Sequence, residues 1–312
     1  MAEATDHQET ESRPALVLGG GGAYGLIQAA HILAAWEAGF RPSIVIGTSV
    51  GSLNGAWLAM HPDRPEDLLR IWLGLDQLRV VKLSPLALAT KLIRTPSAIA
   101  HNNVVPALLD RHLRGASFET TEIPLAVVST NLLRGVKHVF HSGSLRQAIL
   151  ASTAIPGVFD PVEIDGELFV DGCLTASVDI ATAVAMGATE VLAIDLTPPP
   201  ASRRPKTAVG VLRQSLAIMS HATTDAMEAC VRRQMPVRVI RPDLSRSSPW
   251  KLEDSAGAVA HNLRLAREAT HGVIDSDGHV AVSVGLDAGP AGEHSEPVAL
   301  TRFFHPRPAK RA

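Results

Sequence analysis

Apolar residues near the N-terminus form short runs that end in glycine-rich sequence. Residues 15–18 are such a run and stop at four consecutive glycines, residues 19–22. From Leu26 to Trp36, apolar residues then recur every three or four positions until Gly39. A short apolar run bounded by glycines is typical of a buried strand, whereas apolar residues at every third or fourth position are typical of a helix. The pattern therefore predicts a strand, a glycine-rich loop and a helix.

A second unit of the same kind follows directly. Residues 43–46 are mostly apolar and β-branched, residues 47–51 read Gly-Thr-Ser-Val-Gly, and residues 52–60 have a helical pattern. Further strands are predicted at residues 125–129, 136–140, 167–170 and 191–195, and further helices at 145–151, 180–186, 207–234 and 253–271. On the helix at 207–234, one face is predicted to pack in the core through Leu212, Leu216, Met219, Ala226 and Cys230. The alternation predicts an α/β sheet.

The length of 312 residues predicts one large domain, with a segment at each end that lacks sustained hydrophobic periodicity. Residues 1–13 are polar and are predicted to be a mobile N-terminal segment, and the domain is predicted to span residues 14–274. Gly, Pro, His and Ser accumulate after that point, so residues 275–312 predict a weakly structured tail, with residues 280–284 as its one candidate strand. Four prolines within residues 197–205 predict a surface loop.

The charge balance argues against nucleic acid as a partner. Lys and Arg total 29 and Asp and Glu total 31, which leaves no broad basic surface. The two cysteines, Cys173 and Cys230, lack the spacing of a disulfide framework or a zinc site, and we expect buried free thiols. His138 and His141 would point to opposite faces of a predicted strand, so no metal is expected there.

Residues 15–36 contain no Asp, Glu, Lys or Arg and are long enough to resemble a membrane span. Five glycines together with Gln28 and His31 interrupt this apolar stretch. The preceding residues carry four acidic side chains and one basic side chain, whereas a signal peptide begins with basic residues. We therefore expect neither a transmembrane segment nor a signal peptide, and we expect a cytoplasmic location.

The glycine-rich loop permits two interpretations. Gly20, Gly22 and Gly25 form a GxGxxG pattern, which occurs in dinucleotide-binding sites. Such a site usually has an acidic residue at the end of the next strand, but residues 47–49 are Gly-Thr-Ser. A glycine loop before a helix also directs backbone N–H groups at an anion, including a reaction intermediate.

Residues 47–51 match GxSxG, the turn that presents a nucleophilic serine between a strand and a helix. Ser49 comes too early in the chain for the usual α/β-hydrolase order, and none of the 13 histidines has a convincing catalytic context. A serine hydroxyl still needs a base. Asp171 is the best candidate, because it ends an apolar predicted strand and is followed by glycine. The competing acids are Asp160, Asp165, Asp179, which is placed to cap a helix, and Asp195, which also ends a strand.

With these motifs in this order, the chain resembles the patatin-like phospholipases, lipid acyl hydrolases with a Ser-Asp dyad. The resemblance rests on residues 20–25, on residues 47–51, on Asp171-Gly172 and on Ala-Ser-Thr-Ala-Ile-Pro at 151–156, and it extends from about Pro14 to Gly272. It implies a three-layer α/β fold with a mostly parallel sheet and helices on both faces. It also implies that Ser49 and Asp171 form the catalytic dyad.

The resemblance further implies an oxyanion hole made by backbone N–H groups of Gly20, Gly21, Gly22 and Val50, and an acyl-enzyme intermediate. The substrate would be a lipid ester, and neither a metal nor an organic cofactor would be needed. Two residues depart from the family pattern, since Tyr24 replaces a basic residue and Cys173 replaces a small one. The alternatives are a non-catalytic module that binds a nucleotide or acidic ligand, and an inactive relative.

One segment carries a separate prediction about membranes. Residues 80–92 combine leucines and valines with two lysines. Such a mixture is typical of a segment that docks transiently on an anionic membrane, and equally of a helix that covers the sheet. The oligomeric state is not indicated by any pattern in the chain.

Overall fold

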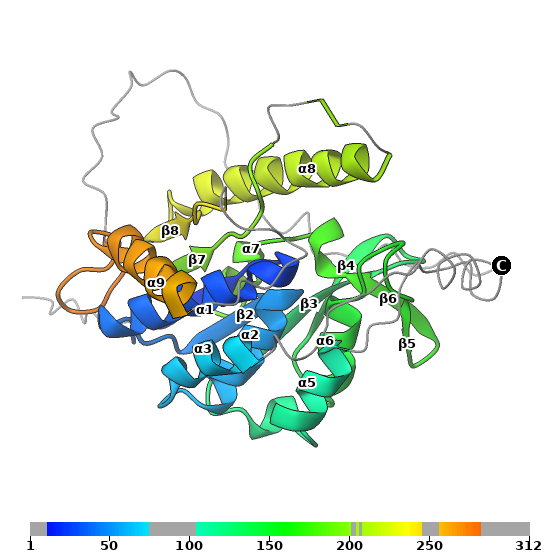
Figure 1. Cartoon of the computed structure of the whole chain (residues 1–312), viewed down its shortest axis with the longest axis horizontal. Coiled ribbons are helices and arrows are strands. Elements are labelled where there is room, and N and C mark those ends of the chain that lie inside the picture. Colours follow the sequence, from blue (N-terminus) through cyan, green and yellow to red (C-terminus); the bar gives the residue numbers. More distant parts are fainter. Residues whose placement is uncertain (1–10, 75–103, 201–203, 206–207, 245–255, 282–312) are drawn as a thin grey trace, which may run out of the picture. The chain divides into compact units, whose positions relative to one another are not determined.

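An eight-stranded sheet forms the centre of the protein in the computed structural model, which describes residues 11–74, 104–200, 204–205, 208–244 and 256–281 (Figure 1). Its strands are β1 (Pro14–Leu18), β2 (Ile44–Thr48), β3 (Leu125–Asn131), β4 (Val136–Phe140), β5 (Val162–Ile164), β6 (Glu167–Asp171), β7 (Glu190–Ile194) and β8 (Val237–Ile240). The described helices are α1 (Gly25–Glu37), α2 (Val50–Met60), α3 (Pro65–Leu73), α5 (Val104–His112), α6 (Leu145–Ser152), α7 (Ile180–Ala185), α8 (Ala208–Val231) and α9 (Ala256–Thr270). All described residues belong to one unit that ends at Ala281.

The strand order is β5-β6-β3-β2-β1-β7-β8, with β4 paired to β3. The pairs from β3 through β2, β1 and β7 to β8 are parallel, whereas β4 and β6 are antiparallel to β3. Val128 of β3 pairs with Thr48 of β2 on one edge and with β4 on the other. The next residue, Ser129, pairs with Asp171 of β6 and again with β4. Strands β2 and β6 therefore share one edge of β3, run in opposite directions, and meet at their C-terminal ends.

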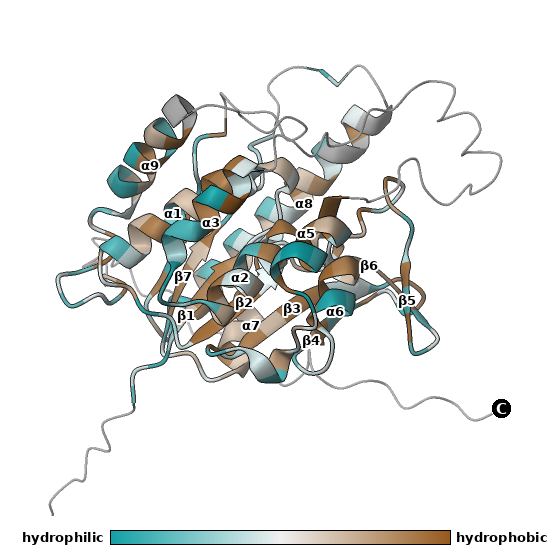
Figure 2. Ribbon diagram, turned by 60° about the horizontal axis from the view of Figure 1, so that its bottom comes forward, coloured by the Kyte–Doolittle hydropathy of each residue, from teal (hydrophilic) through white to brown (hydrophobic). Residues whose placement is uncertain are grey.

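Alternate residues of the central strands point to opposite faces of the sheet, as the period of a strand requires. Leu16 and Leu18 of β1 pack with apolar residues of α1, α2, α3, α5, α6 and α9. Ala15 and Val17 pack with α7 and α8. Figure 1 shows α8 on one side of the sheet and α3 and α5 on the other, and Figure 2 shows the apolar character of β1, β2 and β3 between them. The predicted α/β class with helices on both faces is confirmed.

The predicted elements within the described residues form with bounds close to those expected. The apolar stretch at 15–36 divides into β1, the glycine loop and most of α1, and no described helix has both the length and the hydropathy for a membrane span. Four elements were not predicted, namely α3, α5, β5 and β8. Strands β5 and β8 contain three and four residues, too few for a period to be recognised.

The predicted core face of α8 is wrong. Met219 is 40% exposed and Cys230 is also exposed, whereas Ala217, Ser220 and Thr224 are buried. The buried hydroxyl of Ser220 lies 3.0 Å from the hydroxyl of Thr197, the residue that follows the end of β7 by three positions. The buried face of α8 thus includes hydroxyl groups, one of which is hydrogen-bonded to Thr197, and the apolar residues of the helix do not mark its inner face. The prediction that the Cys230 thiol is buried is therefore also wrong.

Several predictions concern residues outside the described part of the chain. These are the membrane-docking or sheet-covering segment at 80–92 and most of the tail at 275–312. Of the tail, residues 275–281 are described, and Val280 makes an isolated bridge with Ile274. Of the N-terminal segment, residues 11–13 are described and precede β1. The predicted domain bounds stay predictions.

Candidate active site

Ser49 occupies a strained turn between β2 and α2. Its backbone has φ 53° and ψ −122°, a conformation that residues with side chains rarely adopt. The turn also requires glycine on its C-terminal side, because a Cβ on Gly51 would lie 2.1 Å from the carbonyl oxygen of Leu18. The two strands and the helix thus pack too closely for any side chain there. This turn projects the Ser49 hydroxyl at the C-terminal end of β2, as GxSxG predicts.

The structure brings Ser49 and Asp171 together across 122 residues of sequence. The Ser49 Oγ donates a hydrogen bond of 2.6 Å to Asp171 Oδ2. The other carboxylate oxygen, Oδ1, accepts a hydrogen bond of 2.9 Å from the backbone N–H of Cys173. Both side chains are buried, with Ser49 at 5% and Asp171 at 3% exposure. The carboxylate is therefore fixed in orientation, with one oxygen held by the backbone and the other directed at the serine.

Burial raises the pKa of Asp171 above that of an exposed aspartate. Hydrogen bonds from Ser49 and Cys173 oppose the shift, because they stabilise the ionised form. Burial is the larger effect, since removing a carboxylate from water penalises its charge. A carboxylate with a raised pKa accepts a proton more readily than an ordinary one, which suits a general base.

The glycine-rich loop lies directly beside Ser49. A Cβ on Gly20 would lie 3.2 Å from the Cβ of Ser49 and 2.2 Å from the Sγ of Cys173. The N–H of Gly20 donates to the carbonyl oxygen of Ser177 at 3.3 Å. In the described part of the chain, the N–H groups of Gly21 and of Val50, the first residue of α2, donate to no backbone carbonyl. Of the N–H groups predicted to form an oxyanion hole, that of Gly20 is therefore already bonded to the backbone, unlike those of Gly21 and Val50.

Comparison with protein families places this chain in a known group. A family model described as patatin-like phospholipase matches residues 16–184, which include the glycine loop, Ser49 and Asp171. The chain belongs to the patatin-like phospholipase family. An uncharacterized NTE family protein of Mycobacterium tuberculosis is 32% identical over 186 residues, which are 59% of this chain and 49% of the relative. Patatin-like phospholipase domain-containing protein 6 of Homo sapiens is 30% identical over 186 residues, which are 58% of this chain and 13% of the relative.

This patatin-like chain therefore spans about half the length of the mycobacterial relative. Two solved structures are also similar to it. VipD from Legionella pneumophila has 15% identity and a TM-score of 0.47, with 84% of this chain and 66% of that chain covered. The type III effector protein ExoU has 14% identity and a TM-score of 0.37, with 84% and 52% covered.

The patatin-like site includes one side chain whose role the motif at 151–156 did not indicate. Ser152, at the end of α6, is fully buried. Its Oγ accepts a hydrogen bond of 2.8 Å from the backbone N–H of Ser49 and donates one of 2.6 Å to the carbonyl oxygen of Val128 in β3. A single hydroxyl thus joins α6, the strained turn at Ser49 and strand β3, which pairs with both β2 and β6. The only available sequence signal was a serine within a recognised motif.

Removal of the Ser152 hydroxyl is expected to lower kcat and leave KM nearly unchanged. Ser152→Ala leaves the buried N–H of Ser49 without its acceptor, which costs about 1–3 kcal/mol of folding free energy and loosens the turn. A shift of the nucleophile by about 1 Å costs on the order of 10²-fold in rate. Steady-state kinetics and thermal unfolding would measure both effects.

Thr153→Ala is the matched control, because the buried Thr153 hydroxyl bonds to Ile149 within the same helix. It is expected to lose comparable stability with little change in kcat. If Ser152→Ala lost stability but kept the parental kcat, the hydroxyl would be structural only.

The competing acids occupy other positions. Asp179 caps α7 and pairs with a lysine of β4, as expected for a helix cap. Asp165 lies in the turn between β5 and β6 with a positive φ, and Asp160 lies in the loop before β5. Asp195 is buried after β7 and accepts a hydrogen bond from the backbone two residues on. Ser49 donates to Asp171 and not to these carboxylates.

No metal centre is evident in the part of the chain that the structure describes. Within it, no group of three His, Cys, Asp or Glu side chains is arranged to hold a metal ion. His138 of β4 instead packs against Phe140 and Phe169, with ring centroids 4.4 and 4.9 Å apart. Burial lowers the pKa of His138, which favours the neutral ring in this aromatic group.

Proposed function

We propose that this protein is a serine lipid acyl hydrolase that cleaves fatty-acyl esters through an acyl-enzyme. The proposal is carried by the 2.6 Å hydrogen bond from Ser49 Oγ to Asp171 Oδ2, in a buried site at the meeting ends of β2 and β6. It is supported by membership of the patatin-like phospholipase family. Phospholipids and related lipids are the proposed substrate class. A lipid surface is the proposed place of action.

In the first half-reaction, Ser49 Oγ attacks the ester carbonyl carbon while its proton passes to Asp171 Oδ2. The carbonyl oxygen becomes an oxyanion, which the N–H groups of Gly21, Gly22 and Val50 would stabilise. The bond from the carbonyl carbon to the alcohol oxygen then breaks, and the alcohol leaves with the proton held on Asp171. The acyl group remains as an ester on Ser49.

In the second half-reaction, a water molecule attacks the acyl carbon and gives its proton to Asp171. The tetrahedral intermediate collapses, the fatty acid leaves, and the proton returns to Ser49 Oγ. Asp171 thus serves as base and acid in turn, a role for which its raised pKa is favourable. The N-termini of α1 and α2 lie at the glycine loop and Ser49, and both dipoles favour negative charge there.

A fluorophosphonate probe tests the proposal, because it labels an activated serine covalently. The parental protein is expected to be labelled and Ser49→Ala is not. Ser215→Ala is the matched control, since its hydroxyl bonds within the exposed surface of α8. Absence of labelling, together with thermal stabilisation by a dinucleotide, would contradict the hydrolase and favour the binding module.

The lipid part of the proposal has its own test. Hydrolysis of a long-chain ester is expected to rise when the substrate passes from monomers to micelles or vesicles. Liposome binding is expected to require anionic lipid and to weaken with salt, because exposed charges are screened. Strict preference for soluble short-chain esters without vesicle binding would retain the serine hydrolase and exclude the phospholipase.

The pH profile of kcat/KM is expected to fall on the acid side as Asp171 takes up a proton. Only the ionised carboxylate accepts the serine proton, so activity is lost as pH falls through the pKa of Asp171. Burial raises this pKa, which places the acid limb above the value of about 3.9 for an exposed aspartate. A limb at or below that value, measured with a neutral ester, would contradict Asp171 as the base.

A further inference from the structure

A cavity of about 260 Å³ lies between α2, α3 and α5. It shares no lining residue with the dyad or the glycine loop. Trp57 forms part of its wall and lies two helical turns beyond Ser49 on α2, about 12 Å along the helix axis. The cavity is therefore a separate feature of the same face of the sheet, and the proposed reaction makes no use of it.

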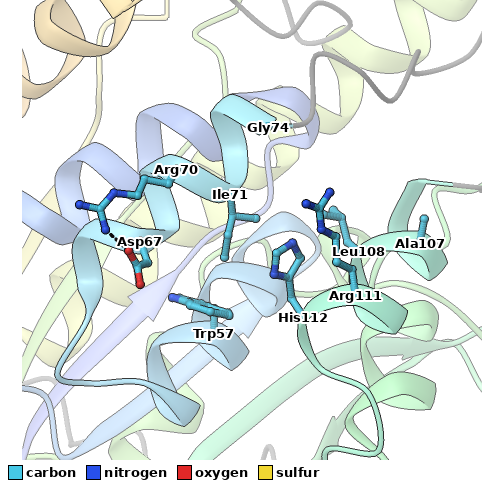
Figure 3. A pocket seen from close by; sticks show the side chains of 9 residues that line it. All are labelled: Trp57, Asp67, Arg70, Ile71, Gly74, Ala107, Leu108, Arg111 and His112. Atoms are coloured by element: carbon cyan, nitrogen blue, oxygen red, sulfur yellow. Dashed lines mark hydrogen bonds and ion pairs between the residues drawn. The ribbon is translucent and has the colours of Figure 1, made fainter.

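One wall of this cavity is apolar. Trp57, Ile71 and Leu108 line it, and the same three helices meet in a smaller apolar crevice beneath it. Figure 3 shows Ile71 and Trp57 facing His112 across the cavity, with the N–H end of the Trp57 indole turned toward Asp67. The remainder of the indole thus presents hydrocarbon to the cavity. Such a wall favours an aliphatic group that leaves water.

Among the described residues, the charged groups that line the cavity include one cation, Arg111, that makes no ion pair. Asp67 forms ion pairs with Arg64 and Arg70, and Figure 3 shows the pair that it makes with Arg70. Arg111 of α5 also lines the cavity and makes no ion pair with another residue of the described chain. Burial and the Arg111 charge lower the pKa of His112 beside it, which favours its neutral form. The cavity consequently combines hydrocarbon with a guanidinium that no described residue pairs, and this combination favours an amphiphilic anion.

We propose that this cavity binds an amphiphilic anion, with a carboxylate or phosphate head on Arg111 and a short aliphatic chain against Ile71, Leu108 and Trp57. Its volume is slightly below the range of about 300–1,000 Å³ that is common for small-molecule sites, so the chain must be short. The site is independent of catalysis at Ser49. It provides this protein with a second place for a fatty acid or an alkyl phosphate.

Calorimetric titration of the full-length Ser49→Ala protein with octanoate and with octyl phosphate tests the site, because this variant binds without turnover. At least one of the two is expected to bind, and the difference between them identifies the head group. Octanol and acetate, which lack the charge or the chain, are expected to bind at least about tenfold more weakly. Equal binding of octanol would overturn the proposal, as would no binding of either anion.

Arg111→Gln in the same background is expected to weaken binding about tenfold or more, because a charge-assisted hydrogen bond is lost. Arg114→Gln is the matched control, since Arg114 is exposed, lies three residues further on and bonds to the backbone of Asp110.

A brominated octanoate is expected to quench the fluorescence of Trp57, and the quenching should fall in Trp57→Phe. Equal affinities of the two arginine variants would place the anion elsewhere and overturn the proposal. Fluorophosphonate labelling of an Arg111→Gln protein that retains Ser49 then reports the hydrolase separately.

Discussion

Ser49→Ala, Asp171→Asn and the double variant are each expected to lose at least about 10³-fold in ester turnover, and the losses are not expected to add. The serine is a poor nucleophile unless the carboxylate takes its proton, so either change removes the same step. Steady-state rates with a single ester substrate measure the three losses. Asp195→Asn is the comparison for the base, because Asp195 also follows a strand in a buried position. Near-parental turnover by a folded Asp171→Asn protein would exclude Asp171 as the base and favour Asp195.

The same Asp171→Asn protein is expected to be more stable than the parent near neutral pH. A folded pKa above the unfolded value means that the folded state holds its proton more tightly, so stability falls as pH rises between the two values. The neutral amide removes this loss, and it can still bond to Ser49 and to the backbone of Cys173. Thermal unfolding across pH would show the gain, and a decrease in stability at neutral pH would contradict the burial effect.

Gly20→Ala is expected to lower turnover at least about 10²-fold, because the added methyl group displaces the loop or the nucleophile. The new Cβ would lie 2.2 Å from Cys173 Sγ and 3.2 Å from Ser49 Cβ, and the first of these distances cannot persist. The double variant Gly20→Ala/Cys173→Ala removes the sulfur and is expected to recover at least about tenfold of the loss, as residues in contact are coupled.

Gly74→Ala is the matched control for the glycine change, since a Cβ there would meet nothing within 4 Å. It is expected to have parental turnover. If Cys173→Ala did not relieve the effect of Gly20→Ala, the contact between the loop and the thiol would not be the cause. Kinetics of the four proteins, with thermal unfolding to verify folding, provide this test.

Much of the site was predictable because its chemistry is local. Gly51 must be glycine because a Cβ there would collide with the carbonyl oxygen of Leu18, and the glycine is visible within five residues as part of GxSxG. The apolar runs before Gly20, Ser49 and Gly172 indicate strands that end at those residues. The ordered combination of these motifs resembles a family, and the family model confirms that membership.

Side-chain orientation on α8 and the role of Ser152 depend on partners far away in the chain. The apolar pattern of α8 indicates the wrong face, because the face that is buried includes Ser220 and Thr224, and Ser220 bonds to the distant Thr197. Ser152 belongs to a recognisable motif, but the N–H that donates to its hydroxyl is 103 residues away and the carbonyl oxygen that accepts from it is 24 residues away. Hydrophobic periodicity contains no information on such partners, since it reports burial and not pairing.

By itself the sequence determined the strands, the glycine loop and the strained serine turn, because each depends on residues that are adjacent in the chain. Only the tertiary structure decided that β6 runs antiparallel on the edge of β3 that β2 also occupies. A strand has the same two-residue period in either direction and on either edge, so no local pattern distinguishes these arrangements. That pairing places the Asp171 carboxylate within hydrogen-bond distance of the Ser49 hydroxyl. It also buries both side chains, and burial raises the pKa of the carboxyl group.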